Sequence, residues 1–178
     1  MKVIAINSIS GGGKTTTTNE LLKRIPNSKA LYFDDRDYAS VSGIFDLCKW
    51  ELEDGADHSL WNLQALVDDI TSLMNENLEY IFLDYPFGYL QKQISGFVSL
   101  SVYVDTPLDV AVARRILRDF KNRSVDEIVS DMDWYIKRGR ESYVNSVKTS
   151  KEYADFIVDG TLTLDDICNL IIEKIQSC

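Results

Sequence analysis

The sequence has few of the side chains that bind zinc or form disulfides. Its 178 residues include one histidine, His58, and three cysteines, Cys48, Cys168 and Cys178, with no C-x-x-C pair. An odd number of widely spaced cysteines excludes a disulfide scaffold, and a single histidine argues against a Cys/His zinc site. The chain instead has 45% hydrophobic residues, enough for a sizeable core in one compact domain.

Basic residues and long apolar runs are also scarce. The chain has 19 lysines and arginines against 28 aspartates and glutamates, a net charge of −9. It therefore lacks the basic surface of a nucleic-acid-binding protein. The apolar run at 3–6 is too short for a signal peptide, and no stretch has the length of a membrane span. We expect a cytoplasmic protein that binds neither nucleic acid nor membrane, with a homo-oligomer left open.

Short strand-like runs alternate with longer helix-like segments along the chain. The strand candidates are 2–6, 30–33, 79–84, 100–105 and 155–159. Apolar residues recur at helical spacing at 59–74, where Ser59 can cap the helix, and after Ser124, where Glu127 completes a capping box. This alternation predicts an α/β fold in which helices cover both faces of a parallel sheet. With no repeat or linker, residues 1–178 form a single predicted domain.

The segment SISGGGKTTTT at 8–18 has the glycines, lysine and hydroxyls of a phosphate-binding loop. It follows a strand candidate and precedes an amphipathic run at 15–25, which is the context that such a loop requires. The glycines let backbone N–H groups turn toward a phosphate, Lys14 can reach between the β- and γ-phosphates, and Thr15 can offer its hydroxyl to Mg²⁺. We expect Mg·ATP to bind at Ser10, Gly11, Gly12, Gly13, Lys14, Thr15 and Thr16.

Ser8 stands where the pattern G-x-x-x-x-G-K-[ST] has its first glycine. That glycine marks the bend where the chain leaves the strand, and a small residue suffices there. ATPases that partition other molecules carry a signature lysine five residues before the loop lysine, but this position is Ile9, and the N-K-x-D sequence of GTPases is absent. These absences favour ATP-dependent phosphotransfer. A regulator that binds ATP without catalysis is the alternative from another class.

Carboxylates follow two of the strand candidates. The sequence LYFDDRDY places Asp34 and Asp35 after the second candidate, and EYIFLD ends in Asp84. The carboxyl ends of parallel strands lie beside the phosphate loop, where an acceptor approaches the γ-phosphoryl group. We therefore expect Asp84 to bind the metal ion or the substrate. The structural alternatives are a solvated turn at 34–37 and a turn that leaves the sheet after Asp84.

The chain resembles the small P-loop kinases of the uridine kinase and phosphoribulokinase group. The matching pieces are SISGGGKTTTT, DDRDY, VDTPLDVAVARRILRD and KEYADFIVDG, in the order in which the family has them. The resemblance covers most of the chain. It implies a three-layer P-loop NTPase fold with a five-stranded parallel sheet and a short arginine-bearing lid at about 115–126.

The resemblance also implies roles for residues near the acceptor. Asp35 and Tyr38 have the spacing of the family's D-x-x-Y, whose aspartate activates the acceptor hydroxyl. Asp35 is therefore the candidate base, and Asp34 can exchange roles with it or support the metal ion. Tyr38, Asp34, Asp84 and Arg140 are the candidate substrate residues, and Arg140 matches an arginine on the helix after the lid.

Arginines are expected to gather around the transferring phosphoryl group, because a chain of net charge −9 needs cations there. Arg115 and Arg118 stand where the family's lid begins, and helical spacing places both opposite the apolar stripe of their helix. Arg123 matches the first lid arginine and is a candidate nucleotide-binding residue. Val125 replaces the second lid arginine, so the lid has fewer cations than the family pattern.

The segment at about 34–58 is the candidate acceptor-binding segment, since its aromatic residues can stack on a base or instead form a small core. A hydroxyl acceptor needs a base such as Asp35, whereas a monophosphate acceptor needs extra arginines. The resemblance implies transfer to a hydroxyl of a small molecule, with a uridine-like nucleoside as the leading candidate. The alternative is a nucleoside monophosphate kinase, in which Arg36, Arg140 and the DYPFG turn would hold the acceptor phosphate.

Overall fold

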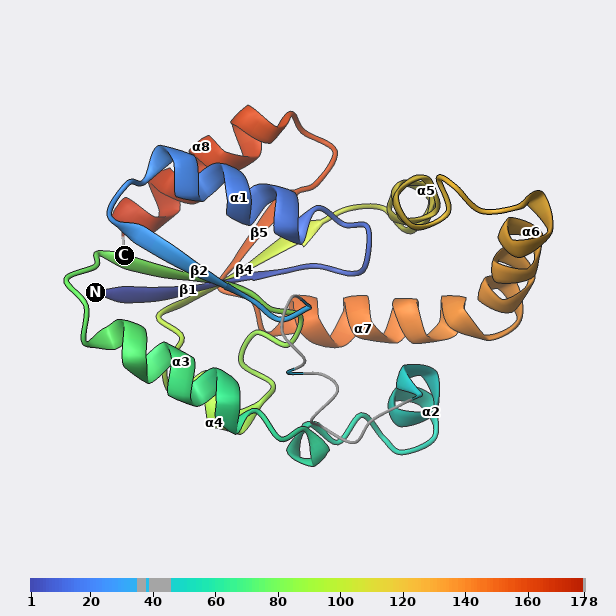
Figure 1. Cartoon of the computed structure of the whole chain (residues 1–178), viewed down its shortest axis with the longest axis horizontal. Coiled ribbons are helices and arrows are strands. Elements are labelled where there is room, and N and C mark those ends of the chain that lie inside the picture. The colour runs from blue at the N-terminus through green and yellow to red at the C-terminus, as the bar shows by residue number, and fades with distance from the viewer. Residues whose placement is uncertain (35–37, 39–45, 178) are drawn as a thin grey trace.

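The computed structural model describes residues 1–34, 38 and 46–177. Five parallel strands form one sheet in the order β2-β3-β1-β4-β5 (Figure 1). They are β1 (Lys2–Asn7), β2 (Ser28–Tyr32), β3 (Tyr80–Asp84), β4 (Leu100–Asp105) and β5 (Phe156–Asp159). The predicted five-stranded parallel sheet is confirmed, and every strand begins and ends within two residues of its expected bounds.

Helices cover both faces of this sheet. Figure 1 shows α1 and α8 on one face and α3 and α4 on the other. The helices are α1 (Lys14–Arg24), α2 (Leu47–Leu52), α3 (Gln64–Met74), α4 (Lys92–Ser95), α5 (Leu108–Asp119), α6 (Val125–Trp134), α7 (Arg140–Glu152) and α8 (Leu164–Gln176), with a 3₁₀-helix η2 (His58–Leu60) and a π-helix η3 (Tyr135–Gly139). No helix in the described part of the chain is long and apolar enough to cross a membrane.

The central strand β1 shows why the sequence produces this architecture. Its residues alternate between two cores: Ile4 and Ile6 pack with α1 and α8, and Val3 and Ala5 pack with α3 and α4. A strand buried on both faces therefore reads as an unbroken apolar run. In the register between β1 and β3, Ile6 pairs with Asp84, so the loop after β1 begins beside the carboxylate that ends β3.

The helix predicted at 59–74 is shorter in the structure. α3 begins later, and the residues before it form η2, which is capped by the Asp57 carboxylate rather than by Ser59. The backbone is extended at Trp61, whose side chain is 3% exposed and belongs to the core cluster beneath α3. Burial of this large aromatic side chain outweighs continuation of the helical periodicity.

A helical hairpin formed by α5 and α6 projects beyond the sheet (Figure 1). Its second helix begins with the predicted capping box, in which Ser124 and Glu127 each hydrogen-bond the backbone N–H of the other. The apolar residues of α6 are not buried as their spacing suggested, because Val125 is 74% exposed and Val129 60%. The π-helix η3 then joins α6 to α7 in one continuous helical run.

Candidate active site

The loop between β1 and α1 turns on glycine. Gly13 has a φ of 104°, in the left-handed region that favours glycine, and forms the N-cap of α1 without a side-chain capping bond. Apart from its chain neighbours, no described atom lies within 4 Å of where a Gly13 Cβ would stand. No side chain in the described part of the chain caps the N–H donors of the first turn of α1, an arrangement that favours binding of an anion such as phosphate.

Ser8, the departure from the glycine pattern, ties this loop to the sheet. Its hydroxyl is buried and donates to the Val104 carbonyl oxygen of β4 at 2.7 Å. Gly12 packs directly on that side chain, since a Cβ at this position would stand 1.8 Å from the Ser8 Oγ. The Thr106 hydroxyl donates to the Gly12 carbonyl oxygen at 2.8 Å. Serine thus provides an anchor that glycine lacks, and Gly12 leaves room for it, while Gly11 lies against the Ala111 carbonyl of α5.

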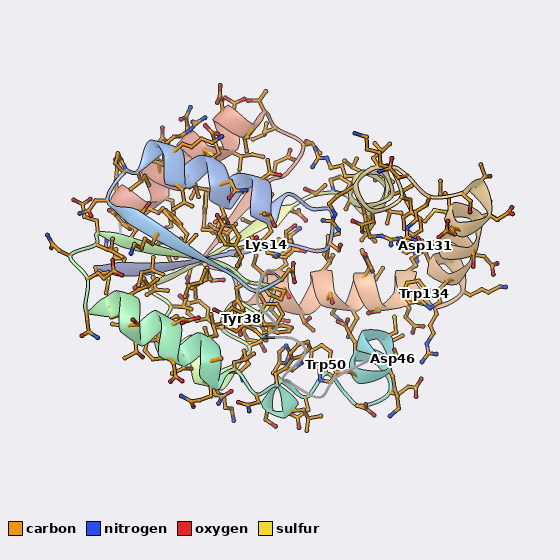
Figure 2. The ribbon with its side chains drawn as sticks, in the orientation of Figure 1. Lys14, Tyr38, Asp46, Trp50, Asp131 and Trp134 are labelled. Carbon is orange, nitrogen blue, oxygen red and sulfur yellow. The ribbon has the colours of Figure 1, made fainter. Side chains whose placement is uncertain are left out.

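Lys14 brings together the loop and the ends of two strands (Figure 2). Its ammonium group pairs with the Asp84 carboxylate at the end of β3 and lies 3.4 Å from the Asp34 carboxylate just after β2. The Lys14 and Asp84 side chains are only 9% and 2% exposed, whereas that of Asp34 is 75% exposed. Three of the residues expected at the site therefore meet at one edge of the sheet, two of them as a buried ion pair.

Oxygen donors for a metal ion are present at the same edge. Thr15 and Thr16 are exposed in the first turn of α1, next to Lys14. Within residues 1–34, 38 and 46–177, no group of three or more His, Cys, Asp or Glu side chains can hold a metal ion. This donor set fits Mg²⁺ bound together with a nucleotide, because Mg²⁺ keeps several waters and takes other ligands from substrate phosphates.

Arg115 is more buried than the helical pattern predicted. The buried residues of α5 are Ala111 and Val112, and the Arg115 side chain is only 11% exposed. Its guanidinium forms a bidentate pair with the Asp131 carboxylate of α6, with one contact at 3.1 Å (Figure 2). The expectation that Arg115 lies opposite the buried face is therefore wrong, because the pairing with Asp131 compensates the burial of its charge.

The other two arginines expected in the lid are exposed. Arg118 pairs with the neighbouring Asp119, and its Nη2 also donates to the Ser10 hydroxyl of the phosphate loop at 3.3 Å. Arg123 pairs with Glu127 at 3.1 Å. Arg118 thus joins the hairpin directly to the loop, whereas Arg123 lies at the turn between α5 and α6.

The residues expected around the acceptor do not all lie at the site. Asp35 and Arg36 lie outside the described residues. Tyr38 is 3% exposed, its hydroxyl donates to Asp69, and its ring stacks on Phe33 with centroids 6.4 Å apart. Trp50 is also buried in this cluster (Figure 2). The described aromatic residues of the segment thus form a small core, the structural alternative that the sequence left open.

Two arginines near the start of α7 have different surroundings. Arg140 is exposed at the first position of α7, directly after the π-helix η3. Arg138, two residues earlier in η3, pairs with Glu53 at 2.7 Å and so links η3 to the end of α2. Arg140 therefore presents its charge at the surface, and Arg138 has a structural contact.

Glu51 is a buried polar residue that the sequence reasoning missed. Its carboxylate, on α2, accepts hydrogen bonds from the hydroxyls of Ser142 and Ser146 on α7, at 2.7 Å from each. Asn145 Nδ2 lies 3.5 Å away. The spacing of the two serines by four residues was the available signal, because it places both hydroxyls on one face of a helix. This contact fixes α2 against α7.

The environment of Glu51 predicts a pH-dependent stability. Burial raises the pKa of its carboxyl group, and the hydrogen bonds from Ser146 and Ser142 oppose that rise. The folded state then binds the proton more tightly than the unfolded state, so the free energy of unfolding falls as pH rises from about 4.3, the ordinary glutamate pKa, through the raised value. Glu51→Gln should remove this decline.

Urea denaturation at intervals between about pH 4 and pH 7 measures the effect. The matched control is Glu53→Gln, which changes an exposed glutamate next to the same helix. We expect the curve of unfolding free energy against pH to flatten for Glu51→Gln and to keep its shape for Glu53→Gln. Parallel curves for wild type and Glu51→Gln would contradict the prediction.

The phosphate loop has a second contact that the sequence did not reveal. The Tyr143 side chain of α7 lies beside the Ser10 side chain and close to Arg115. Its ring packs edge-on against that of Tyr135, with centroids 5.5 Å apart. Burial raises the pKa of the Tyr143 phenol, more than these neighbours lower it, so the hydroxyl keeps its proton at neutral pH.

Comparisons with known sequences all point to one family of kinases. The model of the phosphoribulokinase / uridine kinase family matches residues 62–165, more than half of the chain. A uridine kinase of Borrelia garinii subsp. bavariensis is 28% identical, over 88% of this chain and 85% of its own length. A uridine kinase of Staphylococcus aureus is 27% identical, over 98% of this chain and 95% of its own length.

Solved structures share the fold at low sequence identity. A deoxyadenosine kinase from M. mycoides has a TM-score of 0.58 and 16% identity, covering 99% of this chain and 100% of its own. A shikimate kinase from Acinetobacter baumannii has a TM-score of 0.60 and 16% identity, covering 99% and 94%. The three-layer P-loop kinase fold expected from the sequence is confirmed.

Proposed function

Because the chain belongs to the phosphoribulokinase / uridine kinase family, we propose that it transfers the γ-phosphoryl group of ATP to a hydroxyl of a nucleoside, with uridine as the leading acceptor. The chain is a kinase of small molecules by its family and its fold. The observation that carries the proposal is the meeting of the phosphate loop, Lys14, Asp84 and Asp34 at one edge of the sheet. The relatives named as uridine kinases support the choice of acceptor.

The loop residues bind the triphosphate in this proposal. The N–H groups at 10–15 face the phosphates, except that of Gly12, which donates to the Ile9 carbonyl oxygen at 2.9 Å. Lys14 moves its ammonium group from Asp84 toward the β- and γ-phosphates. The Thr15 hydroxyl and the Asp84 carboxylate would hold Mg²⁺. When bound with ATP, Mg²⁺ neutralises charge that develops on the phosphate oxygens.

A carboxylate after β2 receives the proton of the acceptor hydroxyl. We assign this role to Asp35, on the D-x-x-Y spacing, and assign Asp34 to support of Lys14 and the metal ion because it lies 3.4 Å from that ammonium group. Asp35→Asn should then lower kcat more than Asp34→Asn does. The reverse order would transfer the role of base to Asp34.

Arginines of the α5–α6 hairpin stabilise the transferring group. Arg118 is suited to this role because it already reaches Ser10 in the loop. Ion pairs fix the positions of the other two arginines, Arg115 with Asp131 and Arg123 with Glu127. The same hairpin excludes water when it lies over the nucleotide, which protects ATP from hydrolysis.

The acceptor class is tested by incubating the protein with Mg·ATP and, in separate reactions, uridine, cytidine, shikimate or a set of nucleoside monophosphates. Release of ADP is measured with a coupled assay, and the phosphorylated product is identified by mass spectrometry. We expect product from uridine. Product from the monophosphates alone would reject the hydroxyl-acceptor proposal, and Mg·ATP binding without any phosphorylated acceptor would favour a regulator.

A further inference from the structure

Two side chains from outside the phosphate loop converge on Ser10. The Arg118 guanidinium donates to it from α5 at 3.3 Å, and the Tyr143 side chain, on α7, lies beside both residues. The Ser10 side chain itself is exposed, so neither contact serves to bury it. A guanidinium and a phenolic hydroxyl are both hydrogen-bond donors to phosphate oxygens. Their convergence on one residue of the loop indicates a place where an anionic group is received.

The position of Tyr143 is fixed by the packing of α7. Its neighbour Ser142 is buried and donates to Glu51 of α2, and Ser146 makes the same contact one turn later. Figure 1 shows α7 running between the α5–α6 hairpin and α2. One side of α7 therefore packs against α2, and Tyr143 extends from that anchored turn to the phosphate loop. A donor held in this way loses little conformational entropy on binding a ligand.

We propose that Tyr143 is a further residue of the phosphoryl-transfer site, whose hydroxyl donates a hydrogen bond to the γ-phosphoryl group of bound ATP. The proposal rests on the proposed function only as far as ATP binding at the loop. On binding, the hydroxyl donates to a phosphate oxygen beside Ser10, and no covalent bond changes. Because the acceptor segment includes α2, Tyr143 also fixes the γ-phosphoryl group relative to the acceptor.

The alternative is that Tyr143 only fastens α7 to the loop. The two roles differ in which nucleotides the hydroxyl recognises. A donor to the γ-phosphoryl group strengthens binding of a triphosphate and has no effect on a diphosphate. A purely structural contact changes the affinities for both nucleotides equally, or changes only the stability of the fold. The ratio of affinities for a non-hydrolysable ATP analogue and for ADP therefore separates the two roles without any acceptor.

The test uses isothermal titration calorimetry on the full chain, with Mg²⁺, adenylyl imidodiphosphate and ADP. For Tyr143→Phe we expect about 10-fold weaker binding of the analogue, the loss typical of a hydrogen bond to a charged group, and ADP binding unchanged. The control Tyr135→Phe removes a hydroxyl from the other ring of the same aromatic pair and should leave both affinities unchanged. Melting temperatures of both variants verify folding.

An unchanged ratio of analogue to ADP affinity in Tyr143→Phe would overturn the proposal, whether both affinities stay the same or fall together. A larger loss in Tyr135→Phe than in Tyr143→Phe would overturn it as well. Failure of the proposed function looks different, because a wild-type protein that phosphorylates no nucleoside still reports this ratio. In an active wild type, Tyr143→Phe should also lower kcat about 10-fold at saturating ATP.

Discussion

Lys14→Ala is expected to lower kcat by about 100-fold or more, because it removes a positioned charge from the transferring phosphoryl group. It also removes the partner of Asp84, whose side chain is 2% exposed. Breaking a buried ion pair from one side costs stability, so the melting temperature should fall too. Initial rates of ADP release, measured well below that temperature, give the catalytic effect.

Lys23→Ala is the matched control. Lys23 lies on the same helix, its side chain is 72% exposed, and among the described residues its ion-pair partner is Glu20, one turn away. We expect wild-type turnover and a melting temperature close to wild type, since exposed pairs of this kind contribute little to stability. Wild-type turnover in a folded Lys14→Ala protein would reject the assignment of the phosphate loop as the ATP site.

The strands and the phosphate loop could be predicted because their signals are local. β1 and β4 are buried on both faces and therefore appear in the sequence as apolar runs bounded by polar residues. The loop has its lysine and glycines at fixed spacing between a strand and a helix. The capping box of α6 is likewise specified by two residues three positions apart.

Contacts between distant segments could not be predicted in the same way. The Arg115 pairing with Asp131 turns an expected surface arginine into a buried one, and helical periodicity carries no information about that partner. Glu51 meets Ser142 and Ser146 across more than ninety positions of the chain, so its burial has no local signal. Tyr38 was expected to face the substrate, but its side chain is 3% exposed and its ring packs on Phe33 in the core. Sequence reasoning finds the parts of this site, and tertiary packing decides which face of each part is exposed.

Asp84→Asn tests the charge of the buried carboxylate. The amide keeps the shape of the side chain but loses the negative charge that pairs with Lys14 and that would hold Mg²⁺. We expect kcat to fall about 100-fold, and added Mg²⁺ should not fully restore kcat. The control is Asp159→Asn, which changes an exposed aspartate at the end of β5. Among the described residues, its side chain accepts hydrogen bonds only from Thr161, and the variant should leave turnover unchanged.

The double variant Lys14→Ala with Asp84→Asn tests whether the unpaired buried charge causes the instability of Lys14→Ala. In Lys14→Ala alone, the Asp84 carboxylate is left buried without a cation, and most of the lost stability comes from that unpaired charge. Replacing the carboxylate with a neutral amide removes this penalty, so the double variant should melt at a higher temperature than Lys14→Ala. Its kcat should stay at or below that of either single variant, because neither substitution returns a charge to the phosphoryl group. Thermal melts and initial rates on the four proteins complete the cycle, and a double variant that melts no higher than Lys14→Ala would show that the buried pair is not the source of the instability.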